Sequence, residues 1–399
     1  MHYYEVAPNQ IFRGGQRTFT YCSTERFSIG QLVRIPVGSK HANGIILSKV
    51  TKPEYAVKEI AAPLADVSLP EAYVKLASWL SEYYATPLAT VLQTMLPRGL
   101  EKKRRVRQST ESYPTRKRTN FVLNKDQSAA VSSVKNGSAG TFILHGVTGS
   151  GKTAVYIELA KQVIAEGKSV LILVPEIALT SQLVDEFSQH FSDIILTHSR
   201  QTEAERHLAW LDALQSEHPK VAIGPRSALF LPLPNIGLIV IDESHEPSYK
   251  QEQSPRYHAA RTAHVLAHAH GAKLVLGSAT PSVQDYYLAE VTKRPIIEMP
   301  VPAQQGTVKP QLELIDMTKR TGFKRHRFLS DTLLNRLEED FATDKQAMIF
   351  HNRRGSTAVT LCENCGWQAG CPRCFIPLTL HADLHELRCH ICGLKSQVP

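Results

Sequence analysis

The chain has 399 residues, of which 42% are hydrophobic and 21% charged, and its formal net charge is +9. A chain of this length is too long for one ordinary hydrophobic core, which predicts two or three domains of a folded protein. No run of about 18 apolar residues exists to span a bilayer, and the N-terminus lacks a signal-peptide pattern, so we expect a cytoplasmic protein without membrane contact. The positive charge favours a polyanionic partner, although basic ribosome-associated and membrane-surface proteins share it.

The first hundred residues are typical of a small β-rich module. Short strand-like runs at Thr18–Tyr21, Leu32–Pro36 and Gly44–Val50 are separated by glycines and polar turns. From Leu69 to Leu96 the apolar positions change to helical spacing, which predicts one or two helices that close the module. We therefore expect a first domain over residues 1–100.

Residues 101–120 are rich in lysine and arginine and contain almost nothing apolar. Such a segment cannot offset its ordering entropy by burial, so it is predicted to be a basic linker. A solvated tether and a phosphate-contacting arm are equally consistent with this composition.

Between residues 121 and 299 apolar strands alternate with helical segments, which predicts a parallel sheet covered by helices on both faces. The expected elements are Thr141–His145, Ala154–Glu166, Ser169–Val174, Thr180–Phe191, Ile194–Thr197, Val221–Ile223, Ile236–Ile241 and Lys273–Gly277. A further unit over residues 300–360 should contain a helix near Asp331–Phe341 and a strand at Gln346–Phe350, and a cysteine-rich segment occupies 361–399. The fold class is thus α/β.

A phosphate-binding loop follows the first strand of this region and precedes a helix, which is the context of a genuine Walker A motif. Its glycines let backbone N–H groups surround the phosphates of a nucleotide at a helix N-terminus, where the macrodipole favours negative charge. Lys152 would reach the β- and γ-phosphates, and Thr153 would hold Mg²⁺. The complete loop consists of Gly146, Val147, Thr148, Gly149, Ser150, Gly151, Lys152 and Thr153.

An acidic pair follows the apolar strand Leu238–Ile241, at the carboxyl edge of the predicted sheet, where open α/β folds bind their ligands. Asp242 would position Mg²⁺ and Glu243 would polarise the attacking water, with His245 as the last residue of the catalytic segment. An acidic pair alone more often caps a helix, but together with the loop it indicates a Walker B motif. Upstream, Gln127 is a candidate reader of the adenine edge, on a weaker signal because surface glutamines are common.

Aromatic and basic residues alternate shortly after the acidic pair. This mixture allows bases to stack while phosphates are neutralised, so the segment could report DNA occupancy to the nucleotide site. The alternative is that the aromatic rings pack beneath a surface loop. The residues concerned are Tyr249, Lys250, Arg256, Tyr257 and His258.

Six of the seven cysteines lie within residues 362–392, in three CxxC pairs. In a reducing cytosol such pairs are metal ligands rather than disulfides, and each can supply two thiolates to a tetrahedral Zn²⁺. Because a tetrahedral site needs four ligands, the three pairs supply one complete site and half of a second. The nearby His381, His385 and His390 could in principle substitute for a thiolate.

The motifs, taken in order, resemble those of superfamily 2 helicases. Val174–Thr180 looks like segment Ia of these enzymes, Gly224–Phe230 like their next DNA-contacting segment, and Gly277–Thr280 like motif III. The resemblance implies two RecA-like lobes, the second only partly present and interrupted by a zinc-binding insertion. It also implies DNA-contacting or coupling roles for the loop residues above and for Arg226, Ser278 and Thr280.

Within superfamily 2, the chain most resembles the replication-restart helicases of bacteria. This resemblance rests on the Walker A loop, Asp242–Gln251, Arg256–His258, Asn352–Gly355, the cysteine series, and on Arg17–Tyr21 and Gly30–Pro36, which look like a 3′ DNA-end-binding domain. It implies an ATP-dependent 3′→5′ DNA helicase that binds stalled forks and initiates primosome assembly. The implied cofactors are ATP, Mg²⁺ and Zn²⁺. The implied partners are forked and single-stranded DNA, single-stranded DNA-binding protein and helicase-loading proteins, and the protein would be a monomer.

The same family pattern implies which cysteines share a metal. Cys371, Cys374, Cys389 and Cys392 would form one complete structural zinc site, and Cys362 and Cys365 would be ligands whose partner pair lies beyond Pro399. Motifs V and VI, with the arginine finger, would also follow there, so we expect a fragment that turns over ATP poorly. The winged-helix domain common in this family is not found near residues 101–120, and Ser244 replaces the usual glutamate. A non-catalytic fork-binding scaffold and a double-strand DNA translocase remain the alternatives.

Overall fold

The computed structural model forms two compact units, which divide between Val308 and Lys309 and are described separately. The residues that it describes are 1–12, 17–100, 122–175, 181–303, 311–316, 319–326, 329–350, 360–361, 365–390 and 392–398. The predicted linker 101–120, residues 176–180 of the Ia-like segment, Asn352–Gly355 and Cys362 therefore lie outside the described residues. Within these ranges, every helix is too short or too polar to cross a lipid bilayer.

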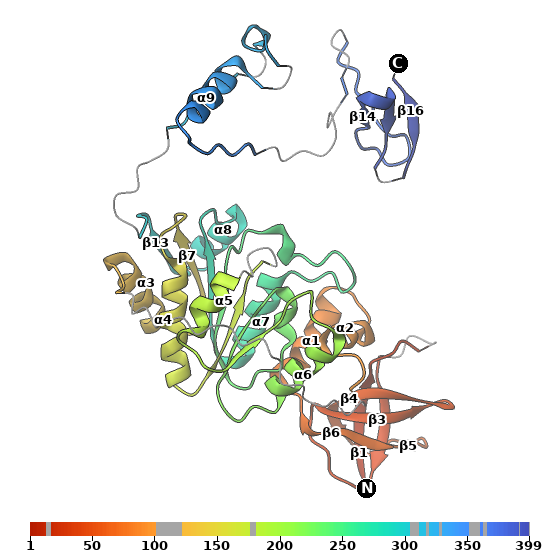
Figure 1. Ribbon diagram of the computed structural model, residues 1–399. Helices are drawn as coiled ribbons and strands as arrows, with labels where there is room; N and C mark the ends of the chain where they lie inside the picture. The colour runs from red at the N-terminus through yellow and green to blue at the C-terminus, as the bar shows by residue number, and fades with distance from the viewer. Residues whose placement is uncertain are drawn as a thin grey trace. The chain divides into compact units, whose positions relative to one another are not determined.

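The first unit begins with a six-stranded sheet in the order β5-β2-β1-β4-β3-β6, antiparallel except where β2 meets β5 (Figure 1). Its strands are β1 (His2–Pro8), β2 (Phe19–Ser23), β3 (Gln31–Val37), β4 (Lys40–Val50), β5 (Lys58–Glu59) and β6 (Ala62–Ser68). The three strands expected from the sequence are confirmed as β2, β3 and β4. Two helices follow, as predicted: α1 (Glu71–Tyr83) and α2 (Leu88–Met95).

The second sheet has seven parallel strands in the order β13-β7-β12-β11-β8-β10-β9. Its strands are β7 (Gly140–Gly146), β8 (Ser169–Leu173), β9 (Ile194–Leu196), β10 (Val221–Gly224), β11 (Ile236–Ile241), β12 (Lys273–Ser278) and β13 (Ile296–Met299). All six strands predicted for this region are confirmed. Strand β13 was not predicted, because its four residues carry too short a pattern to separate from a connector.

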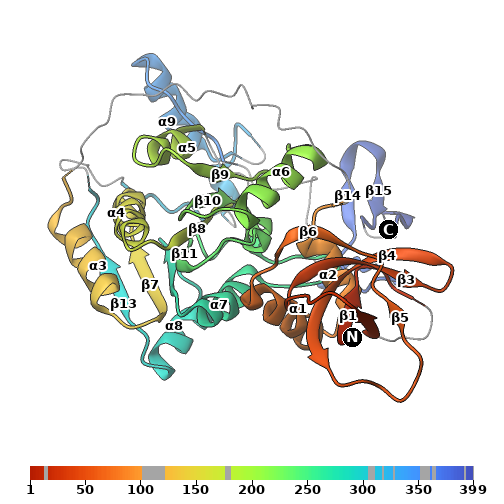
Figure 2. The ribbon, with the colours of Figure 1, turned by 90° about the horizontal axis from the view of Figure 1, so that it is seen from below.

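Helices cover both faces of the parallel sheet (Figure 2). They are α3 (Lys125–Asn136), α4 (Lys152–Ala165), α5 (Ser181–Ser188), α6 (Glu203–Leu214), α7 (Ala259–His270) and α8 (Val283–Val291), with short 3-10 turns η1 (Arg226–Phe230) and η2 (Pro247–Tyr249). Alternate residues of each strand enter different cores, because side chains alternate across a strand. On β8, for example, Val170 and Ile172 pack with α3 and α4, whereas Leu171 and Leu173 pack with α6 and α7.

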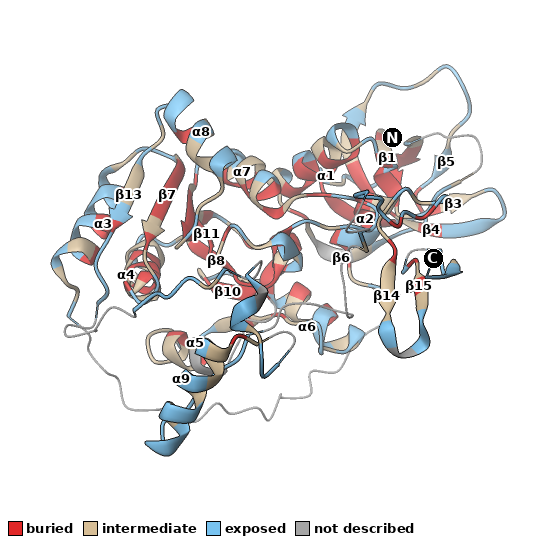
Figure 3. Cartoon of the chain, turned by 90° about the horizontal axis from the view of Figure 1, so that it is seen from above, coloured by how far each residue is buried: buried red, intermediate tan, exposed pale blue. Residues whose placement is uncertain are grey.

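The N-terminal domain and the lobe built on the parallel sheet share one hydrophobic core. The cluster that contains Leu171 and Leu173 continues into α1 and α2, so the lobe and the N-terminal helices are buried together (Figure 3). Polar contacts cross the same boundary. Trp210 donates its indole N–H to the carbonyl of Met95 at 3.1 Å, and the hydroxyl of Tyr73 donates to the carbonyl of Leu231.

The second unit contains the short turn η3 (Arg320–Gly322), the predicted helix as α9 (Asp331–Ala342), and a small antiparallel sheet. The strands of that sheet are β14 (Thr379–His381), β15 (Glu386–Arg388) and β16 (Lys395–Gln397), with the turn η4 (Ala382–Leu384) between the first two. The strand predicted at Gln346–Phe350 is wrong: these residues form no regular structure, and Met348 is 92% exposed. A buried parallel strand needs paired neighbours on both sides, and the described part of this unit provides none for this segment.

Candidate active site and metal centre

The phosphate-binding loop connects β7 to α4. Gly149 and Gly151 have φ angles of 76° and 79°, in the left-handed region that glycine adopts without strain. A Cβ atom on Gly151 would lie 2.3 Å from the side-chain nitrogen of Gln127, so a larger residue would displace that side chain. Helix α4 begins at Lys152, within the loop, so the positive N-terminal end of the helix lies at the loop.

Ser150 supplies a test of whether a phosphate fits this loop. Its side chain is 1% exposed, and its hydroxyl has no hydrogen-bond partner among the described residues. An unpaired buried hydroxyl costs about 1–3 kcal/mol, so such groups normally have a partner. A nucleotide phosphate bound to the loop would provide an acceptor for this hydroxyl. The residues of the loop therefore fit a nucleotide.

Lys152 and the acidic pair come together at the carboxyl ends of β7 and β11. The ammonium group of Lys152 donates to the carbonyl of Gly146 at 3.1 Å and lies 3.9 Å from a carboxylate oxygen of Glu243. Glu243 has φ of 44°, an unfavourable conformation for a residue with a side chain. Strain of this kind concentrates at functional sites. The structure thus places the predicted lysine beside the predicted glutamate.

Asp242 is held by a residue that the sequence did not single out. The buried hydroxyl of Tyr156, on α4, donates to the carboxylate of Asp242 at 2.9 Å. Burial raises the pKa of Asp242 and Glu243 adds to the rise, whereas the hydrogen bond from Tyr156 and the charge of Lys152 lower it. A signal for Tyr156 was present: it stands four residues after Lys152, so both lie on one face of the helix.

The motif III-like segment is bonded to the acidic segment. The Nδ1 atom of His245 lies 2.8 Å from the hydroxyl of Ser278, and that hydroxyl also accepts from the backbone N–H of Thr280 at 2.9 Å. The N–H of Ser244 donates to the carbonyl of Gly277 at 2.9 Å. Because Ser278 is completely buried, its position suits coupling rather than direct contact with DNA.

Gln127 braces the phosphate-binding loop. Its side-chain N–H donates to the carbonyl of Ser150 at 3.1 Å, and its side-chain oxygen accepts from the N–H of Asn124 at 2.9 Å, within the capping box that begins α3. Both ends of the amide are therefore engaged. Reading the adenine edge, which stays a prediction, would require one of these bonds to open.

The rings expected to stack on DNA bases are buried instead. Tyr249 is 1% exposed and Tyr257 is 2% exposed, so the stacking prediction is wrong for both, and the packing alternative describes them. The Tyr249 hydroxyl lies 2.6 Å from the carbonyl of Asp242, which ties this segment to the Walker B motif. Lys250 and Arg256 are exposed, as a DNA contact requires, and His258 is half-buried, which lowers its pKa.

Arg226 is hydrogen-bonded to the start of this segment. Its guanidinium donates to the carbonyls of Ser248 and Lys250. It also lines a cleft of about 250 Å³ between α2 and the lobe, together with His198 and Arg206. His198 follows β9 and Arg206 lies on α6, in segments that carry no motif, so sequence reasoning missed them.

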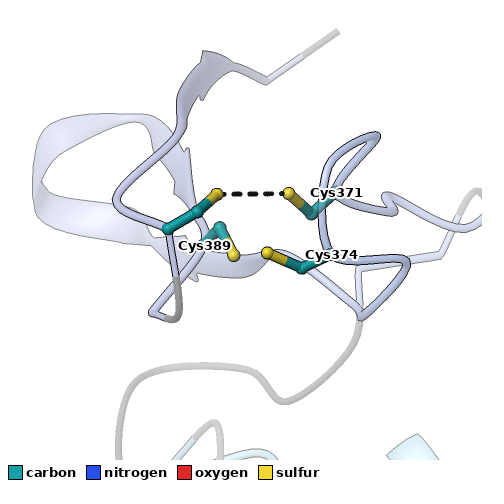
Figure 4. A group of neighbouring side chains, drawn as sticks. Cys371, Cys374 and Cys389 are labelled. Carbon is teal, nitrogen blue, oxygen red and sulfur yellow. Dashed lines mark hydrogen bonds between the residues drawn. The ribbon is translucent and has the colours of Figure 1, made fainter. Parts of the chain in front are cut away.

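Four thiols converge in the second unit (Figure 4). The sulfur atoms of Cys371, Cys374, Cys389 and Cys392 all lie within 4.8 Å of one another, and those of Cys371 and Cys392 are 3.6 Å apart. Tetrahedral zinc with Zn–S bonds of about 2.3 Å requires sulfur atoms about 3.8 Å apart, so the group fits the metal. Cys365 is exposed, and its role as a ligand stays a prediction. His381 and His390 face each other, with their Nε2 atoms 3.2 Å apart, rather than joining the thiols.

The lobe and its site define a class of protein. A parallel sheet that carries a phosphate-binding loop and an acidic pair at its carboxyl edge is typical of P-loop nucleotide-binding proteins. Residues 124–288 match the DEAD/DEAH box helicase family, so the lobe is that of a helicase. Residues 10–97 match the 3′ DNA-binding domain of PriA, and residues 371–396 match the Cys-rich region of the PriA DNA helicase.

Curated relatives agree with these matches. The replication restart protein PriA of Rickettsia felis is 36% identical over 93% of this chain and 57% of its own length. PriA of Bacillus subtilis is 36% identical over 84% and 42%, and that of Helicobacter pylori is 32% identical over 100% and 60%. The chain belongs to the PriA family, and it spans about half the length of the curated relatives it matches.

Proposed function

We propose that the chain is part of a monomeric, cytoplasmic, ATP-dependent 3′→5′ DNA helicase, which binds stalled replication forks and initiates primosome assembly. The observation that carries the proposal is the convergence of Lys152, Asp242 and Glu243 at the edge of a parallel sheet. This sheet shares a core with a domain of the 3′ DNA-binding family.

Each side chain of the nucleotide site would have its own role in binding or hydrolysing ATP. Lys152 and the backbone N–H groups of the loop would bind the phosphates of ATP, and Thr153 and Asp242 would hold Mg²⁺. The magnesium-bound nucleotide supplies the phosphoryl group whose transfer to water releases free energy. Glu243, held near Lys152, would orient the attacking water, and the bond between His245 and Ser278 would link this site to motif III.

The DNA and zinc sites complete the proposal. Single-stranded and forked DNA would contact exposed Lys250 and Arg256 and the cleft that contains Arg206 and Arg226. The four thiols would hold one structural Zn²⁺. Single-stranded DNA-binding protein and helicase-loading proteins are the proposed protein partners, consistent with the name replication restart protein carried by the relatives.

The test is unwinding by the product of the complete open reading frame. Forked duplexes with a 3′ or a 5′ single-stranded tail are compared, and DNA-stimulated ATP turnover is measured in parallel. Lys152→Ala should lower both activities by about 100-fold or more while leaving DNA affinity intact. Lys161→Ala, on the same helix with its side chain 37% exposed, is the matched control and should stay within about twofold of wild type.

Two results would contradict the proposal. One is equal restart activity with and without Lys152, which would favour a non-catalytic scaffold. The other is preferential unwinding of the 5′-tailed substrate, which would reverse the assigned polarity.

A further inference from the structure

Tyr84, the residue directly after α1, belongs to the N-terminal domain and contacts the nucleotide-binding lobe. Its ring makes T-shaped contacts with the stacked pair Trp79 and Tyr83, with centroid distances of 5.9 and 4.9 Å. Its hydroxyl accepts a hydrogen bond from the backbone N–H of His258 at 3.0 Å. Partial burial raises the pKa of this hydroxyl, so it stays protonated. Tyr84 therefore presents a hydrogen-bond acceptor to the lobe.

The contact falls on the base of the loop formed by residues 250–258, named here the basic loop. Lys250 and His258 close this loop through an isolated antiparallel bridge, and the N–H of Gln251 donates to the carbonyl of Tyr257 at 2.9 Å. The ammonium of Lys250 lies 5.4 Å from the centre of the Tyr84 ring, within reach of a cation–π interaction. Tyr84 thus holds both ends of the basic loop.

One residue before Lys250, the chain touches the Walker B motif. Tyr249 is buried, and its hydroxyl lies 2.6 Å from the carbonyl of Asp242 and 3.1 Å from that of Leu173. A shift at the base of the basic loop would therefore move an anchor of the magnesium-binding carboxylate. The path from the N-terminal domain to the nucleotide site consists of Tyr84, the loop base and Tyr249.

We propose that Tyr84 is a positioning residue that couples DNA binding to nucleotide binding by setting the base of the basic loop. The inference rests on the proposed function, because it assigns a regulator to the same nucleotide site. DNA that occupies the N-terminal domain or the basic loop would change the Tyr84 contact, and this change would reach Asp242 through Tyr249. By linkage, nucleotide would change DNA affinity by the same factor.

The test uses the 399-residue chain, a fluorescent ATP analogue with Mg²⁺, and oligothymidine with a free 3′ end. The affinity for the analogue is measured with and without the oligonucleotide, and the ratio is the coupling factor. Tyr84→Phe keeps the ring and removes the acceptor of one hydrogen bond, so the coupling factor should change about fivefold towards unity, which corresponds to ~1 kcal/mol. The separate affinities for analogue and oligonucleotide should stay within about twofold of wild type.

Tyr83→Phe is the matched control, because it removes a neighbouring hydroxyl and preserves the ring contact with Tyr84. Hydrogen–deuterium exchange of residues 249–258 gives a second measurement. Oligothymidine should change the exchange of this segment in wild type and in Tyr83→Phe, and have a smaller effect in Tyr84→Phe. An unchanged coupling factor in Tyr84→Phe, or no coupling in wild type, overturns the inference. Failure of wild type to bind the analogue at all overturns the proposed function instead.

Discussion

The hydrogen bond from Tyr156 to Asp242 is predicted to control magnesium affinity. Tyr156→Phe removes the hydroxyl and leaves one oxygen of the partly buried Asp242 carboxylate without its donor. Hydrogen bonds to charged groups contribute about 1.5–3 kcal/mol, which corresponds to a change of about 10- to 150-fold in an equilibrium constant. If the nucleotide is held through Mg²⁺, its magnesium-dependent affinity should fall by that factor.

The pKa of Asp242 determines how the magnesium affinity should change with pH. Burial already raises this pKa, and the bond from Tyr156 opposes the rise, so Tyr156→Phe should raise the pKa further. Only the ionised carboxylate would bind Mg²⁺, so the expected affinity is present above the folded-state pKa and is lost as the pH falls through it. In Tyr156→Phe this loss should begin at a higher pH than in wild type.

The assay titrates Mg²⁺ against a fluorescent ATP analogue at several pH values. Tyr21→Phe is the matched control, because it removes another buried tyrosine hydroxyl, bonded to the carbonyl of Pro36 in the N-terminal domain. Its magnesium dependence should equal that of wild type. Equal magnesium affinity and an equal pH profile in Tyr156→Phe would refute the role assigned to Tyr156.

Two further predictions concern packing and metal binding. Gly277→Ala would place a Cβ atom 1.7 Å from the Tyr156 hydroxyl, so it should destabilise the fold by about 1–3 kcal/mol in urea unfolding. Combination with Tyr156→Phe should recover part of that loss, and strictly additive effects would exclude this clash as the cause. Cys389→Ser should remove the zinc bound by the four thiols, as measured by elemental analysis of the purified chain. Cys22→Ser, in the N-terminal domain, should retain the metal, and full zinc content in Cys389→Ser would disprove the ligand assignment.

The sequence predicted the parallel sheet because its strands are continuous apolar runs, which are buried on both faces. It predicted the positions of the Walker residues because each of the two motifs directly follows an apolar strand. Their side chains therefore lie at the carboxyl end of that strand. It did not reveal Tyr156 as a partner of Asp242, since these residues are 86 positions apart and meet only when β11 enters the sheet.

The error at Tyr249 and Tyr257 has a physical origin. Aromatic residues among basic ones suit either base stacking or packing beneath a loop, and composition alone does not distinguish these cases. Burial decides between them: both rings are enclosed, and the hydroxyl of Tyr249 is bonded to the carbonyl of Asp242. The predicted strand at Gln346–Phe350 failed for a related reason, because its apolar residues carry no information on whether a pairing neighbour exists.

The shared core constrains how DNA and nucleotide can affect each other. Helices α1 and α2 belong to the same hydrophobic cluster as Ile239 and Ile241 of β11, the strand that leads to Asp242. Separation of the N-terminal domain from the lobe would expose these helices, at about 1.5–3 kcal/mol for each large apolar side chain. A rigid-body separation is therefore costly. The contact of Tyr84 with His258 and Lys250 lies at the edge of this interface and can change without opening it. Coupling should thus pass through movement of the basic loop while the two domains stay packed together.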